Sequence, residues 1–341
     1  MKQSNRLLAM ILAGAMTAGS LAGCGGSTSS DSPTAGSAGS AAASDTGSSK
    51  GSITVITMAL NSDHWHAVQA GAILAGQEYN YDIKVLGPND ESNAQEQCNE
   101  ILDAVSAGSD AIVLAANNPD TVVSTAADVH ADGMPLIAID ASLPDENAYD
   151  AFLGTNNYEA GKSVGEYIVG QNSDAKVAII RGLVGTTVHD TRCTGISDGV
   201  EDSGGEVVDI QPADSDRSKA VTVAENLIQT HPEITAIAAT SDEMALGAYE
   251  AVKAAGKEGE IVVSGFDGAR GALESIIAGE LDGSGAQDPV YEGYNGVGLA
   301  VKVLEGESFE KENECPFRIV TPENAQEVYD ELMSNLEAAG F

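Results

Sequence analysis

Two sets of four apolar, strand-like runs follow each other along the chain with almost the same spacing. The starts of the first set lie 28, 30 and 24 residues apart, and those of the second set 30, 30 and 25. Spacing that repeats in this way indicates an internal duplication of one structural unit. The first set begins at Ile53, Tyr81, Ala111 and Pro135, and the second at Lys176, Glu206, Ala236 and Ile261.

Helix-length segments separate these runs. The clearest is Arg217–Thr230, whose apolar residues recur with the 3.6-residue period of one helix face. The runs themselves are almost continuously apolar, which is typical of strands covered on both faces of a sheet. Strand–helix alternation of this length predicts right-handed βαβ units with parallel strands. We therefore expect an α/β fold with two doubly wound parallel-sheet lobes.

Two aspartates occupy equivalent positions in the two sets. Asp140 ends the fourth run of the first set, and Asp267 ends the fourth run of the second. Ligands of doubly wound sheets bind beyond the carboxyl ends of the strands. Two lobes that face each other through those ends would enclose a cleft, and we expect both carboxylates to lie in it.

The N-terminus carries a pattern for export and attachment. Lys2 and Arg6 precede a short apolar run, and small residues lead to Cys24, as in secretory signal peptides. Leu-Ala-Gly-Cys resembles the bacterial lipobox, which implies removal of residues 1–23 and a lipid on Cys24; an ordinary signal peptide with an incidental cysteine is the alternative. Residues 24–52, rich in Gly and Ser, predict a flexible tether because they can bury little apolar surface.

Size, charge and cysteine content limit what the remaining chain can be. Residues 53–341 exceed the usual size of one core, which favours two domains. The formal net charge of −36 repels phosphate groups, so we expect no nucleic-acid partner. Cys98, Cys193 and Cys315 are far apart and form no Cys-x-x-Cys pair. They predict no zinc site and no disulfide framework, although a single disulfide is left open.

Side chains that follow the first strand of each set are candidates for the cleft. Ser62, His64 and Trp65 follow the run at 53, and His189 and Asp190 stand at matching positions in the second set. An aromatic face suits the C–H face of a sugar, while anchoring of a helix to the sheet is the alternative for Trp65. For Asp190 the alternative is an exposed helix start, where a carboxylate favours the helix dipole.

Three motifs carry a resemblance to a known family: Gln211-Pro-Ala-Asp-Ser-Asp-Arg217, Asp242-Glu-Met-Ala-Leu-Gly-Ala248 and Gly265-Phe-Asp-Gly268. With them, residues 53 to about 320 resemble the type I periplasmic binding proteins, most closely those that bind ribose. The resemblance implies a hinged two-lobe receptor whose chain crosses between lobes near residues 155–157, 287–289 and 315–317. The lobes expected are residues 53–155 with 288–315, and residues 156–287 with 316–341.

The resemblance also implies which residues line the cleft. The pocket carboxylates of the family map onto Asp140 and Asp267, and its hinge glutamine maps onto Gln287. Its aromatic pair maps onto His64 and Trp65, and only the second position keeps the aromatic residue of the family. These positions agree with the duplication argument for the two aspartates.

Other ribose contacts of the family are replaced in this sequence. The arginine that follows the first pocket aspartate is Ala141, and the second pocket arginine maps onto Asp190. The third pocket aromatic maps onto Ser215, and the two pocket asparagines map onto Ser62 and Ser241. The scaffold is thus similar, but the resemblance does not imply ribose as the ligand.

The replacements shift the predicted pocket from hydrogen-bond donation to acceptance, because two guanidinium groups are lost and a carboxylate is gained. Arg192 matches a further family arginine, which we interpret as structural rather than ligand-contacting. A hexose, a sugar alcohol or an inositol would supply the donors, and the serines leave room for it. An amine-bearing ligand is the alternative, and Arg181 or Arg270 could instead partner the buried carboxylates.

By resemblance, the protein is the solute-binding component of an ABC importer that delivers its ligand to a permease driven by separate ATPase subunits. We expect a monomer, without a cofactor, held by lipid on the extracellular face of the cytoplasmic membrane, and we expect a Gram-positive host. A receptor that senses a ligand and signals through a membrane partner is the alternative.

No enzymatic or metal site is predicted. Gly195-Ile-Ser-Asp-Gly199 fits the Gly-x-Ser-x-Gly string, but it lies in a helical stretch and not at a strand–turn–helix elbow. His64 and His66 are two residues apart, so their side chains diverge on a helix and are poorly placed to share a metal ion.

Overall fold

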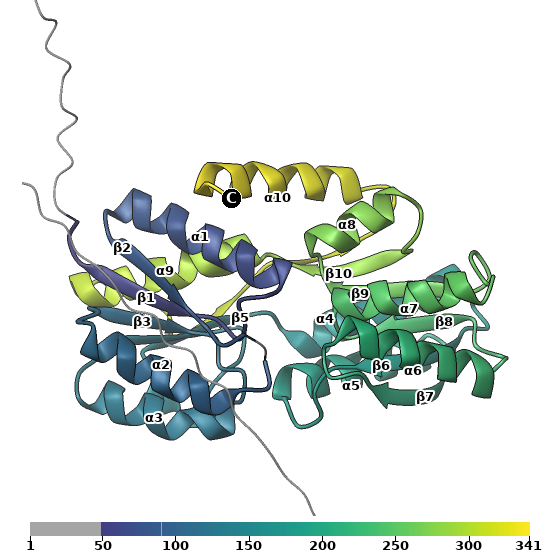
Figure 1. Cartoon of the computed structure of the whole chain (residues 1–341), viewed down its shortest axis with the longest axis horizontal. Coiled ribbons are helices and arrows are strands. Elements are labelled where there is room, and N and C mark those ends of the chain that lie inside the picture. The colour runs from purple at the N-terminus through teal and green to yellow at the C-terminus, as the bar shows by residue number, and fades with distance from the viewer. Residues whose placement is uncertain (1–48, 90) are drawn as a thin grey trace, which may run out of the picture. The chain divides into compact units, whose positions relative to one another are not determined.

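The computed structural model describes residues 49–89 and 91–341. Cys24, the predicted signal peptide and nearly all of the predicted tether lie outside the described residues. Two six-stranded sheets form the cores of two lobes (Figure 1). The expected fold class, two doubly wound lobes joined by a three-strand hinge, is confirmed.

The first sheet has the strand order β11-β5-β4-β3-β1-β2 and is parallel throughout. The second has the order β12-β10-β9-β8-β6-β7 and is parallel except for the β10–β12 pair. All eight predicted runs are strands. The bounds of the first sheet are β1 Ser52–Ile56, β2 Asp82–Leu86, β3 Ala111–Leu114, β4 Leu136–Ile139, β5 Ala151–Gly154 and β11 Glu312–Glu314. Those of the second are β6 Lys176–Arg181, β7 Glu206–Pro212, β8 Ala236–Ala239, β9 Val262–Asp267, β10 Gly283–Gln287 and β12 Phe317–Val320.

Helices cover both faces of each sheet, which explains the continuously apolar strands. In the first lobe α1 and α9 pack on one face and α2 and α3 on the other. In the second lobe α4 and α5 cover one face, and α6, α7 and α8 the other. The helices are α1 Asp63–Tyr79, α2 Ala94–Ser106, α3 Pro119–Ala131, α4 Asn157–Gln171, α5 Thr187–Asp202, α6 Arg217–Thr230, α7 Asp242–Ala254, α8 Arg270–Ile277, α9 Pro289–Glu305 and α10 Ala325–Ala339, with a 3₁₀ turn, η1, at Glu146–Ala148.

The chain passes between the lobes three times. It leaves the first sheet after β5, returns after β10 into α9, and leaves again between β11 and β12. The crossings fall at residues 155–156, 288 and 315–316. The C-terminal helix α10 touches α8 of the second lobe and α1 of the first, and Figure 1 shows it lying over both.

Side-chain caps fix where many of the helices begin. Asn118 accepts a hydrogen bond from the backbone N–H of Thr121 at 2.9 Å, and Asp288 accepts one from Tyr291 at 2.9 Å. In α3 and α9 a proline follows the cap, where its fixed φ suits the first helical residue. These caps place the helix starts, and with them the cleft residues, at the carboxyl ends of the strands.

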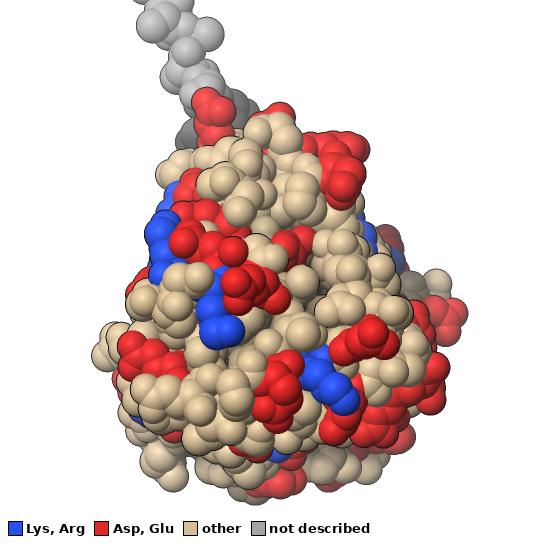
Figure 2. All heavy atoms as spheres, turned by 90° about the vertical axis from the view of Figure 1, so that its right-hand side faces the viewer, with Lys and Arg blue, Asp and Glu red and all other residues tan. Residues whose placement is uncertain are grey.

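The acidic composition is visible on the surface. Figure 2 shows the end of the second lobe, where Asp and Glu side chains are spread over the face and Lys and Arg are few. In the described part of the chain, no helix has both the length and the apolar character needed to cross a membrane. Cys98, Cys193 and Cys315 are buried free thiols.

Candidate functional site

A cavity of about 620 Å³ lies between the two lobes, at the carboxyl ends of both sheets. Its volume is in the usual range for small-molecule sites. Nine of the ten residues expected in the cleft line it: Ser62, His64, Trp65, Asp140, His189, Ser215, Ser241, Asp267 and Gln287. The two halves of the duplicated chain thus meet at one site.

The equivalent aspartates share an unusual backbone. Asp140 has φ 60° and Asp267 has φ 120°, and positive φ is costly for residues other than glycine. In each lobe this conformation occurs where a strand ends and the chain turns toward the cavity. Strain repeated at matching positions supports a role for both carboxylates at the site.

A buried guanidinium joins the two aspartates. Arg192 Nη1 donates to Asp267 Oδ1 at 2.9 Å, and its Nη2 lies 4.0 Å from Asp140 Oδ1. Its Nε donates to Asn157 Oδ1 at 2.7 Å, and the group stacks on Phe266 at 3.9 Å from the ring centre. Arg192 also lines the cavity. Arg192, which we interpret as structural rather than ligand-contacting, thus lies at the cavity wall as well as within this network.

Asp190 is the expected cleft residue that lies elsewhere. It does not line the cavity, and its carboxylate forms an ion pair with Arg181 of β6. Its side chain is 45% exposed. The prediction that Asp190 adds an acceptor to the pocket is thus corrected by its placement at the exposed start of α5. Arg270 also lies outside the cavity lining and pairs with Asp63 at 3.6 Å.

Glu91 is a cleft residue that the sequence did not reveal. It belongs to the first lobe and lies 3.9 Å from His189 Nε2 of the second. Burial raises the pKa of Glu91, but hydrogen bonds with His189, Trp65 and Ser215 and the charge of His189 lower it overall. Glu91 therefore links the lobes across the cavity as a carboxylate.

Several polar atoms at the cavity wall have no partner among the described residues. They are both side-chain polar atoms of Asn117, Oγ of Ser241 and Nδ1 of His64. All three residues are at least nine-tenths buried and line the cavity. Buried polar groups are normally hydrogen-bonded, so these atoms leave hydrogen-bonding capacity unused in residues that border the cavity.

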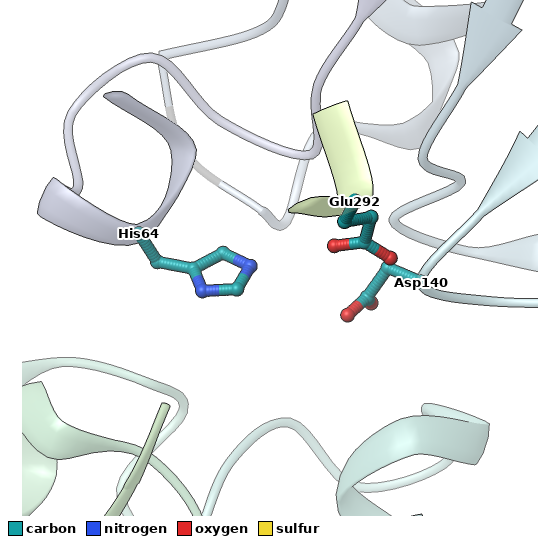
Figure 3. Close-up of side chains that lie close together, drawn as sticks. All are labelled: His64, Asp140 and Glu292. Carbon is teal, nitrogen blue, oxygen red and sulfur yellow. The ribbon is translucent and has the colours of Figure 1, made fainter. Parts of the chain in front are cut away.

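Behind Asp140 lies a second buried carboxyl group. Glu292, in the first turn of α9, is 2% exposed, and the ligating atoms of His64, Asp140 and Glu292 lie within 4.8 Å of one another (Figure 3). Burial, and then the charge of Asp140, raise the pKa of Glu292 well above its usual range. Burial also raises the pKa of Asp140, against the opposing charges of Arg192 and His64.

The profile of the periplasmic binding protein domain matches residues 53–308. The chain belongs to this family. The periplasmic binding protein described here is similar to a ribose import binding protein of Bacillus subtilis, 32% identical over 240 residues that cover 70% of this chain and 77% of the relative. It is also similar to a putative rhizopine-binding protein of Rhizobium meliloti, 31% identical over 255 residues, 69% of this chain and 79% of the relative.

Solved structures give the same result for this periplasmic binding protein. An ABC transporter solute-binding protein of Bacillus halodurans with bound myo-inositol has a TM-score of 0.75 and 28% identity, covering 84% of this chain and 99% of that one. One of Agrobacterium vitis with bound D-fucose has a TM-score of 0.76 and 29% identity, covering 80% and 96%. Such relatives are sugar-binding components of ABC transporters and not enzymes, which confirms the prediction of a non-enzymatic role.

Proposed function

We propose that this protein captures a hexose, a sugar alcohol or an inositol in the cavity between its lobes and delivers it to an ABC permease. The observation that carries the proposal is the cavity wall itself, in which carboxylates from both lobes, Asp140 and Asp267, flank the guanidinium of Arg192. Carboxylates accept hydrogen bonds and a guanidinium donates them, so together they suit the vicinal hydroxyl groups of a polyol. The cavity is large enough for a six-carbon ligand.

Capture would work by closure of the lobes on the ligand. Contacts from both lobes favour the closed form, by as much as the ligand's affinity differs between the open and closed states. Gln287, at the end of β10 just before a crossing, donates to Asp267 Oδ1 at 2.9 Å. It would thereby couple the hinge to a side chain that touches the ligand.

A binding panel tests the ligand class. Thermal shift followed by calorimetry would compare hexoses, pentoses, sugar alcohols and inositols. A ligand at 100 times its Kd should stabilise the protein by about 2.7 kcal/mol. The proposal fails if no sugar or polyol binds. A pentose that binds far more tightly than every hexose and inositol would contradict the proposed ligand size.

Transport is distinguished from sensing by the phenotype of a deletion. Loss of the gene should abolish uptake of the labelled ligand identified in the panel. Normal uptake combined with a lost transcriptional or motile response to that ligand would instead indicate a receptor that signals through a membrane partner.

The proposed location is the extracellular face of the cytoplasmic membrane of a Gram-positive cell, with a lipid on Cys24. We predict that Cys24→Ala releases folded, ligand-binding protein into the medium, because the mature chain then lacks its anchor. Immunoblots of membrane and medium fractions measure this. Continued attachment of the variant to the membrane would refute the lipid anchor without affecting the ligand proposal.

A further inference from the structure

Asp242 is a buried residue of the second lobe whose carboxyl group holds the turn after Asp267. It is the first residue of α7, is 1% exposed and does not line the cavity. Its Oδ2 accepts a hydrogen bond from the backbone N–H of Ala269 at 2.7 Å, and its Oδ1 accepts one from Ser284 Oγ at 2.7 Å. Ser284 Oγ accepts in turn from the backbone N–H of Gly268 at 3.2 Å. Asp242 thus holds both amide groups of this turn, one directly and one through Ser284.

The backbone of this turn is costly to maintain. Asp267 has φ 120° and Gly268 has φ 73°, so two consecutive residues have positive φ. Only glycine adopts positive φ without a steric cost, and a strained conformation persists where surrounding contacts over-determine it. The hydrogen bonds at Gly268 and Ala269 are such contacts, because they fix the two backbone N–H groups that follow the strained aspartate. The direction in which the Asp267 side chain leaves the backbone therefore depends on Asp242.

Close packing of α7 on the second sheet brings the carboxyl group of Asp242 to the turn. Gly265 of β9 lies opposite Ser284 of β10, and a Cβ on Gly265 would stand 2.1 Å from Oδ1 of Asp242. A side chain at this position would displace the carboxyl group. The motif that begins at Asp242 and the Gly265-Phe-Asp-Gly268 motif thus meet at this contact.

We propose that Asp242 is a positioning residue for Asp267: it fixes the turn from which Asp267 reaches the ligand, without touching the ligand itself. The inference rests on the proposed function, in which Asp267 accepts hydrogen bonds from the ligand. The side chain of Asp267 lines the cavity and is 15% exposed. Arg192 and Gln287 donate to its Oδ1 at 2.9 Å each. These donors orient the carboxylate once its backbone is in place, and Asp242 supports that backbone.

Two substitutions of Asp242 test whether its hydrogen bonds matter for binding. Asp242→Ala leaves the N–H of Ala269 without its acceptor, and we expect ligand affinity to fall about tenfold or more. Asp242→Asn should recover most of that loss, because an amide accepts from Ala269 and donates to Ser284 Oγ. Burial, and then the charge of Asp267, raise the pKa of Asp242 well above its usual range, so an uncharged side chain suits this position. Equal losses in the two variants would contradict positioning by hydrogen bonds.

Calorimetry measures the Kd in each variant. The probe is whichever of D-glucose, D-galactose, D-mannitol and myo-inositol binds the unmodified protein most tightly. Urea unfolding verifies that each variant is folded under the conditions of the titration.

Two buried serines in neighbouring strands give a milder pair of variants, which serves if Asp242→Ala does not fold. Ser284 of β10 and Ser264 of β9 are each 1% exposed, but Ser264 Oγ has no hydrogen-bond partner among the described residues. Ser284→Ala breaks the link between Asp242 and Gly268 and should weaken binding about three- to tenfold. Ser264→Ala is the control and should change the Kd less than about twofold, because no hydrogen bond is lost. Equal Kd values in the two variants would overturn the proposal.

A double-mutant cycle distinguishes positioning from general support of the fold. If Asp242 acts through Asp267, then Asp242→Ala should add less than about threefold to the loss in Asp267→Ala. Ser241, the residue before Asp242, also lines the cavity, and a disturbance of α7 would lower affinity in both backgrounds. Fully additive losses would therefore overturn the proposal. Ser284→Ala replaces Asp242→Ala in the cycle if the latter does not fold.

The remaining outcomes separate this role from the proposed function. Hydrogen exchange at the amides of Gly268 and Ala269, measured without ligand, should be faster in Ser284→Ala than in Ser264→Ala; equal exchange would overturn the positioning role whatever the ligand. If a probe binds and none of the Asp242 and Ser284 variants changes its Kd, the positioning role is wrong and the proposed function stands. If no sugar or polyol binds the unmodified protein, the proposed function fails, and the positioning role fails with it.

Discussion

At the scale of single residues, the cavity is held by side chains that join one lobe to the other. Glu91 of the first lobe meets His189 of the second, and His189 Nε2 forms a 3.0 Å hydrogen bond with Ser215 Oγ. The other ring nitrogen, Nδ1, lies 3.0 Å from Thr240 Oγ1. The imidazole is therefore held by its own lobe and offers its edge to Glu91 of the other lobe.

We predict that Glu91→Gln weakens ligand binding by about three- to tenfold, because it removes a charged contact present only in the closed form. The loss should appear as faster dissociation in stopped-flow measurements, with little change in association. The same substitution at Glu327, an exposed residue of α10, is the control. An unchanged dissociation rate in Glu91→Gln would show that Glu91 does not hold the closed form.

A pH dependence of stability follows from Glu292. Its pKa in the folded protein is raised well above 4.5, so the folded state binds a proton that the unfolded state has lost. The stability linked to this proton is full below about pH 4.5 and falls as the pH rises through the folded pKa. We predict that Glu292→Gln gains stability over the parent as the pH increases, measured by urea unfolding at pH 5 and pH 8. A constant difference at both values would contradict the buried proton.

The sequence located most of these residues but missed others for a physical reason. Asp140 and Asp267 were predictable because the duplication puts both at strand ends. Glu91 lies in a loop with no periodic pattern, and Glu292 is in a helix more than 150 residues from Asp140. Only the packing of α9 behind the first sheet brings Glu292 to the site. Asn117 followed a predicted strand, so the strand-end rule could have found it.

At the scale of elements, glycines determine how closely helices pack in pairs. Gly195 and Gly199 of α5 face α4, where a Cβ would stand 2.2 Å from the backbone oxygens of Tyr158 and Lys162. The Gly-x-Ser-x-Gly string is thus a helix-packing surface within α5. Its central Ser197 donates to the carbonyl oxygen of Cys193 at 2.9 Å, within the same helix.

We predict that Gly165→Ala in α4 destabilises the protein by about 1–3 kcal/mol, because its Cβ would lie 2.4 Å from the carbonyl oxygen of Ile196. Gly170→Ala in the same helix has no atom within 4 Å and should be neutral or stabilising by up to about 1 kcal/mol. Urea unfolding of the two variants gives the comparison. Equal stabilities would mean that α4 and α5 can shift enough to accommodate the added methyl group without loss of stability.

Elements with a clear apolar pattern were predicted from the sequence, and an element without such a pattern was missed. Arg217–Thr230 was predicted from its periodicity and is helix α6 with those bounds. Strand β10, Gly283–Gln287, has the sequence GSGAQ and no apolar run, so periodicity could not reveal it. The hinge position came instead from the resemblance at Gln287. β10 pairs with β9 and β12, so its place in the sheet is fixed by these neighbours rather than by an apolar pattern of its own.

At the scale of the whole molecule, closure should be visible through the single tryptophan. Trp65 is 3% exposed, borders the cavity, and stacks edge-on against His64 with ring centres 4.7 Å apart. Opening of the lobes would separate it from Val188 of the second lobe, which belongs to the same buried cluster, and admit water. We predict that the emission of Trp65 shifts to shorter wavelength when ligand closes the cleft. A fluorescence titration measures this shift. Trp65→Phe should abolish the signal, and unchanged emission at calorimetric saturation would place Trp65 outside the closing surface.

The C-terminal helix is a second feature of the whole molecule, since α10 touches α1 and α8 on different lobes. Its residues Ala325 and Val328 belong to the core of the second lobe. If the lobes close on a ligand as proposed, the helix would move with the second lobe and its contact with α1 would change.

The buried carboxyl groups at the cavity affect how readily the protein would close without a ligand. An empty protein that closed would enclose Asp140, Asp267 and Glu292 with a single guanidinium, away from water that could screen them. This desolvation cost applies only to the empty protein, because a bound ligand would donate hydrogen bonds to these carboxyl groups. If the protein delivers its ligand to an ABC permease as proposed, a permease that recognises closed lobes would seldom meet an unloaded one, and little ATP would be spent on cycles that carry nothing.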